Sequence, residues 1–224
     1  MLVSREFDTA LAGVLGLLVG SFLNVVIYRT PVMMYRDWLA DAVANLMSSK
    51  DAPSLWTLVF GPKSAPPAGL EAAADKAAIA IENLPPFDLS RPASRCGACG
   101  HKIRWYQNIP VLSYLVLRGR CAACKTSISP RYPLVELITG ALFALCAYRF
   151  GLTPAGALWA AFAALLVCQF LIDFDTQFLP DSLNYPLLWL GLIGAAMGWT
   201  GVAVSASVWG AVFGYLSLWL VYHG

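Results

Sequence analysis

Five long apolar stretches dominate the hydrophobic pattern of the chain. They cover roughly residues 9–28, 133–150, 153–172, 183–199 and 202–222. A helix needs about 20 mostly apolar residues to cross a bilayer, and each stretch is close to that length. Glycine and other small residues recur in them, as packing between helices in lipid favours. The pattern therefore predicts five transmembrane helices.

The composition supports this interpretation. Hydrophobic residues occupy 58% of the 224 positions and charged residues 12%, whereas a soluble domain has about 25% charged residues. This balance excludes a disordered chain, a coiled coil and an ordinary cytosolic globule. The net charge of +2 gives no reason to expect a nucleic-acid partner.

A cleaved signal peptide is the alternative interpretation of the first apolar stretch. Such a peptide begins with a positively charged region, but here Arg5 is accompanied by Glu6 and Asp8. No Ala-x-Ala pattern precedes a mature domain. We therefore expect an uncleaved membrane anchor.

The basic residues are concentrated in one block of the chain. Of the 15 lysines and arginines, 13 lie between Arg29 and Arg131. Because loops rich in these residues stay on the cytoplasmic side, we expect this block to be cytoplasmic and the N-terminus to be outside. Five spans then return residues 223–224 to the cytoplasmic side, and the short link over residues 173–182 lies there too.

The first part of this block predicts short helices and linkers. Met34, Trp38, Ala42 and Leu46 are spaced four apart, which predicts an amphipathic helix over residues 32–48, lying on the membrane surface or against the rest of the block. Residues 49–93 are rich in Pro, Ala, Ser and Gly. Within them, residues 63–70 and 84–87 are typical of linkers, and residues 72–82 predict a short helix.

Two Cys-x-x-Cys pairs form the strongest motif. Cys96 and Cys99 are separated by 21 residues from Cys121 and Cys124, and two such pairs can present four thiolates to one tetrahedral zinc ion. We expect a structural zinc site, since four thiolates leave no open position for a reacting water. Two disulfides are the alternative, which reducing conditions in the cytoplasm disfavour. A redox pair is another, although no thioredoxin-like pattern surrounds the cysteines.

Acidic residues are scarce near the apolar stretches and therefore informative. Asp173 directly follows the third stretch, and ionisable groups at such depth are often functional. Asp175 would face away on a continued helix, so we expect it to be solvated or in a loop. Asp181 or Ser182 is suited to cap the next helix. Glu136 can pair with a basic residue, complement the helix N-terminus or have a functional role.

These motifs together resemble the bacterial type IV prepilin peptidases, which serve type IV pili and type II secretion. The resemblance covers nearly the whole chain. It is carried by residues 20–29 (GSFLNVVIYR), the four-cysteine block, residues 131–136 (RYPLVE) and residues 173–181 (DFDTQFLPD). It implies an all-α polytopic protein of the bacterial inner membrane with a small cytoplasmic zinc module.

The resemblance also implies an activity. The family cleaves the basic leader of prepilins and pseudopilins after a glycine on the cytoplasmic side, and methylates the new N-terminus from S-adenosylmethionine. Asp173 would be the first catalytic aspartate. No residue can be assigned to S-adenosylmethionine. The expected partners are these substrates and the lipid bilayer, with no nucleic acid.

The expected organisation has three parts. Residues 1–28 form the first transmembrane helix, residues 29–131 form a cytoplasmic domain with the zinc site and a loop insertion at about residues 49–86, and residues 132–224 form helices two to five with Asp173. The family's second aspartate lies in a Gly-x-Gly-Asp motif, which does not occur in this chain. We therefore interpret the chain as truncated at its C-terminus and expect peptidase activity to be absent or very weak.

Three other functions fit parts of the sequence. A non-enzymatic zinc-binding membrane scaffold of a pilus or secretion assembly would need the cysteines but not Asp173. A transporter would place its acidic residues near the middle of the membrane, whereas here they lie at one boundary. The third possibility is that the truncated chain retains only the methyl-transfer activity.

Overall fold

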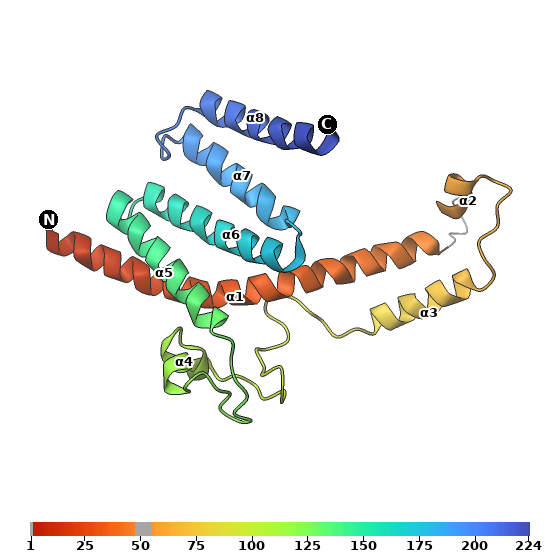
Figure 1. Cartoon of the computed structure of the whole chain (residues 1–224), viewed down its shortest axis with the longest axis horizontal. Helices are drawn as coiled ribbons and strands as arrows, with labels where there is room; N and C mark the ends of the chain where they lie inside the picture. The colour runs from red at the N-terminus through yellow and green to blue at the C-terminus, as the bar shows by residue number, and fades with distance from the viewer. Residues whose placement is uncertain (1, 48–54) are drawn as a thin grey trace. The chain divides into compact units, whose positions relative to one another are not determined.

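The computed structural model describes residues 2–47 and 55–224, and the regular elements in these ranges are helices joined by irregular loops (Figure 1). The elements are α1 (Leu2–Leu46), α2 (Leu55–Phe60), α3 (Leu70–Glu82), η1 (Trp105–Asn108), α4 (Leu112–Val116), α5 (Arg131–Phe150), α6 (Pro154–Thr176), α7 (Asp181–Ala196) and α8 (Val204–His223). Within the described ranges, bridges between extended residues occur only as isolated pairs. The predicted all-α class is confirmed.

Contacts between residues divide the chain into two compact units. The membrane unit comprises Met1–Ile27 and Ser94–Gly224, and the second unit comprises Tyr28–Ala93. The cysteine-containing segment therefore packs with the long apolar helices. The three-part division expected from the sequence is a division by cellular compartment, which these contacts do not test.

Helices in all five predicted regions form the membrane unit, with α5, α6, α7 and α8 packed in chain order (Figure 1). Among the described residues, four helices are long and apolar enough to cross a membrane: Ser4–Leu46, Arg131–Phe150, Pro154–Thr176 and Val204–His223. The fifth, α7, has 16 residues and is therefore about 24 Å long, shorter than the hydrocarbon core of about 30 Å.

Small residues bring α1 and α5 into close contact. A methyl group added at Gly16 would lie 2.8 Å from Gly140 Cα, and one added at Gly20 would lie 2.7 Å from Glu136 Cα. The hydroxyl of the neighbouring Thr139 is fully buried and donates to Val135 O at 2.8 Å. The helices thus pack backbone against backbone, as small residues allow in lipid.

The sequence-based end of the first helix, Tyr28, is wrong. Helix α1 continues to Leu46 with Pro31 inside it. Pro31 removes one helical hydrogen bond, but the next 15 residues include no glycine and several strong helix formers, so the helix resumes.

The helix predicted over residues 32–48 is therefore present as the continuation of α1, with residue 48 outside the described residues. Its predicted apolar face is not the buried one. Trp38 remains 45% exposed and Leu46 43% exposed, whereas Val43 is buried. The four-residue spacing identified the helix but not the side that packs.

In the second unit, residues 84–87 are held against α1 instead of forming a free linker. Arg29 donates to the Asp88 and Pro92 carbonyl oxygens at 2.7 and 2.6 Å, and Arg36 donates to Pro85 O at 2.9 Å. Both guanidinium groups lie over the Phe87 ring.

The remainder of the expected insertion is partly helical. The helix predicted over residues 72–82 is confirmed as α3, whereas α2 was not predicted. Residues 49–54 of the insertion lie outside the described residues.

Candidate metal centre and membrane-boundary carboxylates

The first cysteine pair lies in a tight backbone turn. The Cys96 N–H donates to His101 O at 2.9 Å, and the Gly100 N–H donates back to Cys96 O at 2.9 Å. Gly100 has φ +71°, which glycine adopts without steric cost. The turn leaves the Cys96 and Cys99 side chains on its inner side, where both sulfurs join one cluster.

The second cysteine pair repeats this turn. The Cys121 N–H donates to Thr126 O at 2.8 Å, and the Lys125 N–H donates to Cys121 O at 3.1 Å. Lys125 occupies the position equivalent to Gly100 and has φ +61°, a conformation that costs a side-chain-bearing residue about 1–2 kcal/mol. Two copies of one turn thus hold the four thiols.

The four sulfurs form a compact cluster suited to a metal ion. The Sγ atoms of Cys96, Cys99, Cys121 and Cys124 all lie within 4.8 Å of one another, and those of Cys96 and Cys124 are 3.8 Å apart. Zinc–sulfur bonds of about 2.3 Å place neighbouring sulfurs about 3.8 Å apart in a regular tetrahedron. All four are free thiols, so the disulfide alternative is not supported.

Local hydrogen bonds favour ionisation of two of these thiols. Backbone N–H groups of Cys99 and Ala98 lower the pKa of Cys96. The Thr126 hydroxyl, 3.2 Å from the Cys124 sulfur, and the Thr126 N–H lower the pKa of Cys124 to about 6. The His101 N–H is the largest single influence on the pKa of Cys99 and lowers it. The neighbouring Cys124, Cys96 and Cys121 sulfurs and burial together outweigh it, so the pKa of Cys99 is raised to about 11. A bound cation would relieve this repulsion.

Asp175 is neutralised by an arginine from another helix. Its two carboxylate oxygens accept from Arg131 Nη1 and Nη2 at 2.8 and 2.7 Å. Arg131 begins α5, and Asp175 lies in the last turn of α6. The loop alternative for Asp175 is therefore wrong, because α6 extends to Thr176. The side chain is exposed, as expected of a solvated residue, but its pairing with Arg131 was not predicted.

Asp173 lies two residues earlier on α6 and has a different environment. Its side chain is exposed and forms no ion pair with any described residue. The one salt bridge among the described residues joins Arg131 to Asp175. Its backbone oxygen accepts from the Gln177 N–H, which ends the helix. Asp173 is thus a free carboxylate at the end of α6.

The predicted cap of the next helix is wrong. Pro180 occupies the N-cap position of α7, without a side-chain hydrogen bond, and Asp181 is the first helical residue. The fixed φ of Pro180 (−62°) already suits the entry into the helix. Neither Asp181 nor Ser182 has the capping role.

Glu136 binds the backbone of the cysteine-containing segment. Its carboxylate is buried, 8% exposed, and Oε2 accepts from the Val111 N–H at 2.7 Å. Among the described residues Glu136 forms no ion pair, so the basic partner is not supported. The carboxylate does bind a helix N-terminus, that of α4, whose N-cap is Val111. The bond joins the second turn of α5 to the start of α4.

A pair of amides near Asp173 was not predicted. Gln169 Nε2 donates to Asn184 Oδ1 at 2.6 Å, and Asn184 Nδ2 donates to Leu179 O at 3.1 Å. Gln169 lies one helical turn before Asp173 on the same side of α6. The sequence offered one sign of this pair, since Gln169 and Asn184 are amides within otherwise apolar stretches. The pair joins α6, α7 and their connecting loop.

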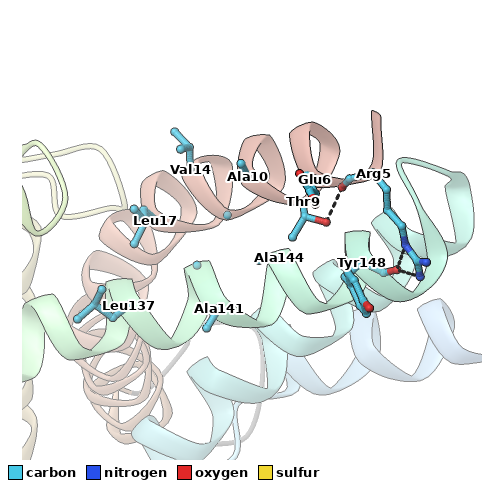
Figure 2. A pocket seen from close by; sticks show the side chains of 12 residues that line it. Arg5, Glu6, Thr9, Ala10, Val14, Leu17, Leu137, Ala141, Ala144 and Tyr148 are labelled. Carbon is cyan, nitrogen blue, oxygen red and sulfur yellow. Dashed lines mark hydrogen bonds between the residues drawn. The ribbon is translucent and has the colours of Figure 1, made fainter. Parts of the chain in front are cut away.

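An apolar groove of about 720 Å³ lies between α1 and α5, away from these groups (Figure 2). At one end, Arg5 Nε donates to Tyr148 O at 3.0 Å, and its guanidinium lies 4.3 Å from the Tyr148 ring centre. The lining residues include neither Asp173 nor the cysteines. The groove is therefore not part of the candidate site.

Two family models match the chain. Residues 14–150 match the Bacterial Peptidase A24 N-terminal domain, and residues 159–224 match the Type IV leader peptidase family. The first model includes all four cysteines, and the second includes Asp173.

Similar curated proteins are named prepilin leader peptidase/N-methyltransferase. That of Neisseria gonorrhoeae is 45% identical over 98% of this chain and 66% of its own length. Those of Stutzerimonas stutzeri and Dichelobacter nodosus are 47% and 40% identical, over 93% and 99% of this chain and 62% and 70% of their own lengths. This chain thus spans less than two thirds of the first two relatives. No solved structure matches it.

Proposed function

Because the chain belongs to the type IV leader peptidase family, we propose that the native protein containing it is a membrane aspartyl endopeptidase. It would cleave the basic leader of prepilins and pseudopilins after a glycine and methylate the new N-terminus. The names of the relatives support both activities. The structural observation that carries the proposal is Asp173, an exposed carboxylate without an ion pair in the described residues, at the end of a membrane helix.

Asp173 would act as one member of a pair of carboxyl groups. Two carboxylates held close together cannot both ionise easily, so the pair shares one proton. The ionised member takes a proton from the attacking water while the protonated member hydrogen-bonds the scissile carbonyl, and the proton taken from the water then passes to the leaving amine. The ion pair of Arg131 with Asp175 leaves Asp173 as the free acid of the two.

The second acid of the pair is not identified in residues 1–224. The Gly-x-Gly-Asp motif that holds it in the family does not occur in them. We therefore expect a polypeptide of residues 1–224 to cleave prepilins very slowly or not at all. Normal processing of a purified prepilin by this polypeptide would contradict that expectation.

The four cysteines would hold a structural zinc ion. The sulfur spacing supports it, and four thiolate ligands give a closed site that stabilises a fold and leaves no position for substrate. S-adenosylmethionine would be the methyl donor. No residues of this chain are assigned to it.

The proposed location is the bacterial cytoplasmic membrane, with the N-terminus in the periplasm and the cysteines and Asp173 facing the cytoplasm. Since Arg131 at the start of α5 binds Asp175 at the end of α6, the cysteine segment and Asp173 share one side of the membrane. The cluster of basic residues supports the cytoplasmic side.

The decisive test is Asp173→Asn in the native protein. We expect loss of leader cleavage, measured as the mobility shift of a purified prepilin, with zinc content unchanged. Asp41→Asn, an exposed aspartate on α1, is the matched control and should cleave normally. Normal cleavage by Asp173→Asn would favour the non-enzymatic zinc-binding scaffold instead.

A further inference from the structure

The cysteine-containing segment carries charges of one sign. Residues 94–130, here called the metal module, contain no aspartate or glutamate. They contain six cations, all exposed: Arg95, Lys102, Arg104, Arg118, Arg120 and Lys125. A zinc ion bound by four thiolates contributes two negative charges, so the module remains positive with the metal bound. Its surface therefore favours an anionic partner.

The same module exposes large apolar side chains. Leu112, Leu115 and Val116 of α4 are 61%, 63% and 81% exposed, and Trp105 of η1 is 81% exposed. The three α4 residues are spaced three and four apart, so they share one helix face. Helix α4 packs against η1. Exposed apolar groups in adjacent elements of a segment that also exposes six cations are typical of a surface that binds another apolar phase.

The module is attached next to the membrane boundary. Val111 directly precedes α4, and its N–H is bound by Glu136, in the second turn of the membrane helix α5. Helix α4 accordingly lies beside the beginning of α5 (Figure 1).

The backbone at this attachment is strained. Val111 has φ +59°, and the Leu112 N–H donates to Pro110 O at 2.5 Å. These features define a γ-turn of the rare, strained form, and positive φ is exceptional for a β-branched residue. The Glu136 hydrogen bond holds this turn, so α4 is kept at the start of the membrane helix at some energetic cost.

We propose that η1 and α4 lie in the interfacial layer of the bilayer. The side chains of Trp105, Leu112, Leu115 and Val116 enter the lipid, and the surrounding cations bind the phosphate groups of anionic phospholipids. Tryptophan favours this layer, and basic residues are attracted to an anionic membrane surface.

A leader peptide is a poorer partner for this surface. If the proposed function holds, the leader is basic, and a module with six cations and no acid would repel it. The membrane assignment itself rests on exposure, charge and attachment, and does not require peptidase activity.

The proposal can be tested with the full chain in lipid nanodiscs containing about one third phosphatidylglycerol. The eight tryptophans are replaced by 5-fluorotryptophan, and Trp105→Phe identifies the Trp105 fluorine signal. We expect a spin label on lipid to broaden this signal and a water-soluble gadolinium chelate to leave it sharp. Trp209 of the apolar helix α8 serves as the lipid-exposed control. Broadening by the chelate alone would overturn the proposal and favour a protein or nucleic-acid partner.

The anionic lipid is tested by spin-labelled phosphatidylglycerol against spin-labelled phosphatidylcholine. We expect at least twofold stronger broadening of Trp105 by the anionic lipid. The preference should disappear in Arg118→Glu/Arg120→Glu and persist in Lys63→Glu/Lys76→Glu, which makes the same charge change in the second unit. An equal effect of the two lipids on the unmodified chain would contradict the headgroup assignment. Retained zinc in each variant verifies that the module is folded.

Discussion

Two aspartates in the last turns of α6 differ because of helix geometry. Asp173 and Asp175 are two residues apart, so their side chains leave the helix about 200° apart. Asp175 meets Arg131 in a bidentate ion pair, while Asp173 remains exposed. The two side chains are chemically identical. Their different positions around one helix give Asp175 a structural role and leave Asp173 for the proposed catalytic role.

The ion pair should contribute modestly to stability. Both side chains are 38% exposed, so solvent screens them, and we expect a coupling of about 1 kcal/mol between Arg131→Ala and Asp175→Ala. A double-mutant cycle of unfolding in detergent measures it. Arg131→Ala alone should cost more than Asp175→Ala, since Arg131 Nη2 also donates to Leu171 O at 3.4 Å. A coupling of zero would contradict the pair.

Asp88 should make the loop of the second unit sensitive to acid. The Ser90 hydroxyl at 2.6 Å, followed by the Ser90 and Arg91 N–H groups at 2.7 Å, lowers the pKa of Asp88 below its usual 3.8. A group with a lowered folded-state pKa stabilises the fold above its unfolded pKa and loses that effect as the pH falls through the folded one. Hydrogen exchange of the Ser90 and Arg91 amides should therefore be slower at pH 5 than at pH 3, after correction for intrinsic rates.

The comparison for Asp88 is the variant Asp88→Ala. It should exchange these amides quickly at both pH values, and Asp75→Ala on α3 should behave like the unmodified protein. If Asp88→Ala retained the slow exchange at pH 5, the carboxylate would not be the group that holds the loop.

At the scale of elements, close contact between helices depends on where glycine lies. Gly16 and Gly20 face α5 at distances that exclude a side chain, whereas Gly210 and Gly214 on α8 have nothing within 4 Å. Both α1 and α8 contain glycines spaced four residues apart, but of these two helices only α1 packs closely through them. The attachment of α4 to α5 likewise involves a specific position, the hydrogen bond that the Val111 N–H donates to Glu136.

Gly16→Ala should destabilise the packing of α1 on α5. The new methyl group would lie 2.7 Å from Phe143 Cβ and 2.8 Å from Gly140 Cα and Thr139 O, and backbone atoms cannot move aside as a flexible side chain can. Overpacking of this kind costs about 1–3 kcal/mol. Thermal unfolding in detergent should show the loss, while Gly214→Ala should leave the midpoint unchanged or raise it. Equal midpoints for the two variants would mean that α1 and α5 are not in close contact.

At the scale of the whole molecule, two kinds of stabilisation act side by side. The membrane helices satisfy their backbone hydrogen bonds internally, as lipid requires. The metal module has little regular structure: η1 and α4 contain four and five residues, and Cys121 is buried among mostly exposed neighbours. Such a segment is expected to depend on a metal ion for its fold.

Removal of zinc should therefore unfold the module and leave the helices intact. We expect about one zinc ion per chain by mass spectrometry, and rapid hydrogen exchange over residues 94–130 after chelation, with little change in helical circular dichroism. Cys124→Ser should lower the zinc content in the same way. Cys146→Ala in α5 is the control and should retain full zinc. Zinc-free protein with a protected module would show that packing alone folds it.

The sequence by itself determined the membrane class, the positions of the five apolar helices and the four-cysteine cluster, because apolar periodicity and ligand spacing are local properties of the chain. The catalytic role of Asp173 came from the family resemblance and stays a prediction. The length of α1 past Pro31 and the buried side of its second half were not accessible, since several helix formers outweigh one proline and burial depends on distant residues.

Only the tertiary structure decided the partners of the charged groups. Asp175 binds Arg131, 44 residues away in the chain, and Glu136 binds Val111, 25 residues away. Neither pairing follows from local pattern, because each depends on which helices lie side by side and which way they face. The same arrangement holds the start of α4 against the beginning of α5 and leaves the Asp173 side chain exposed at the end of α6.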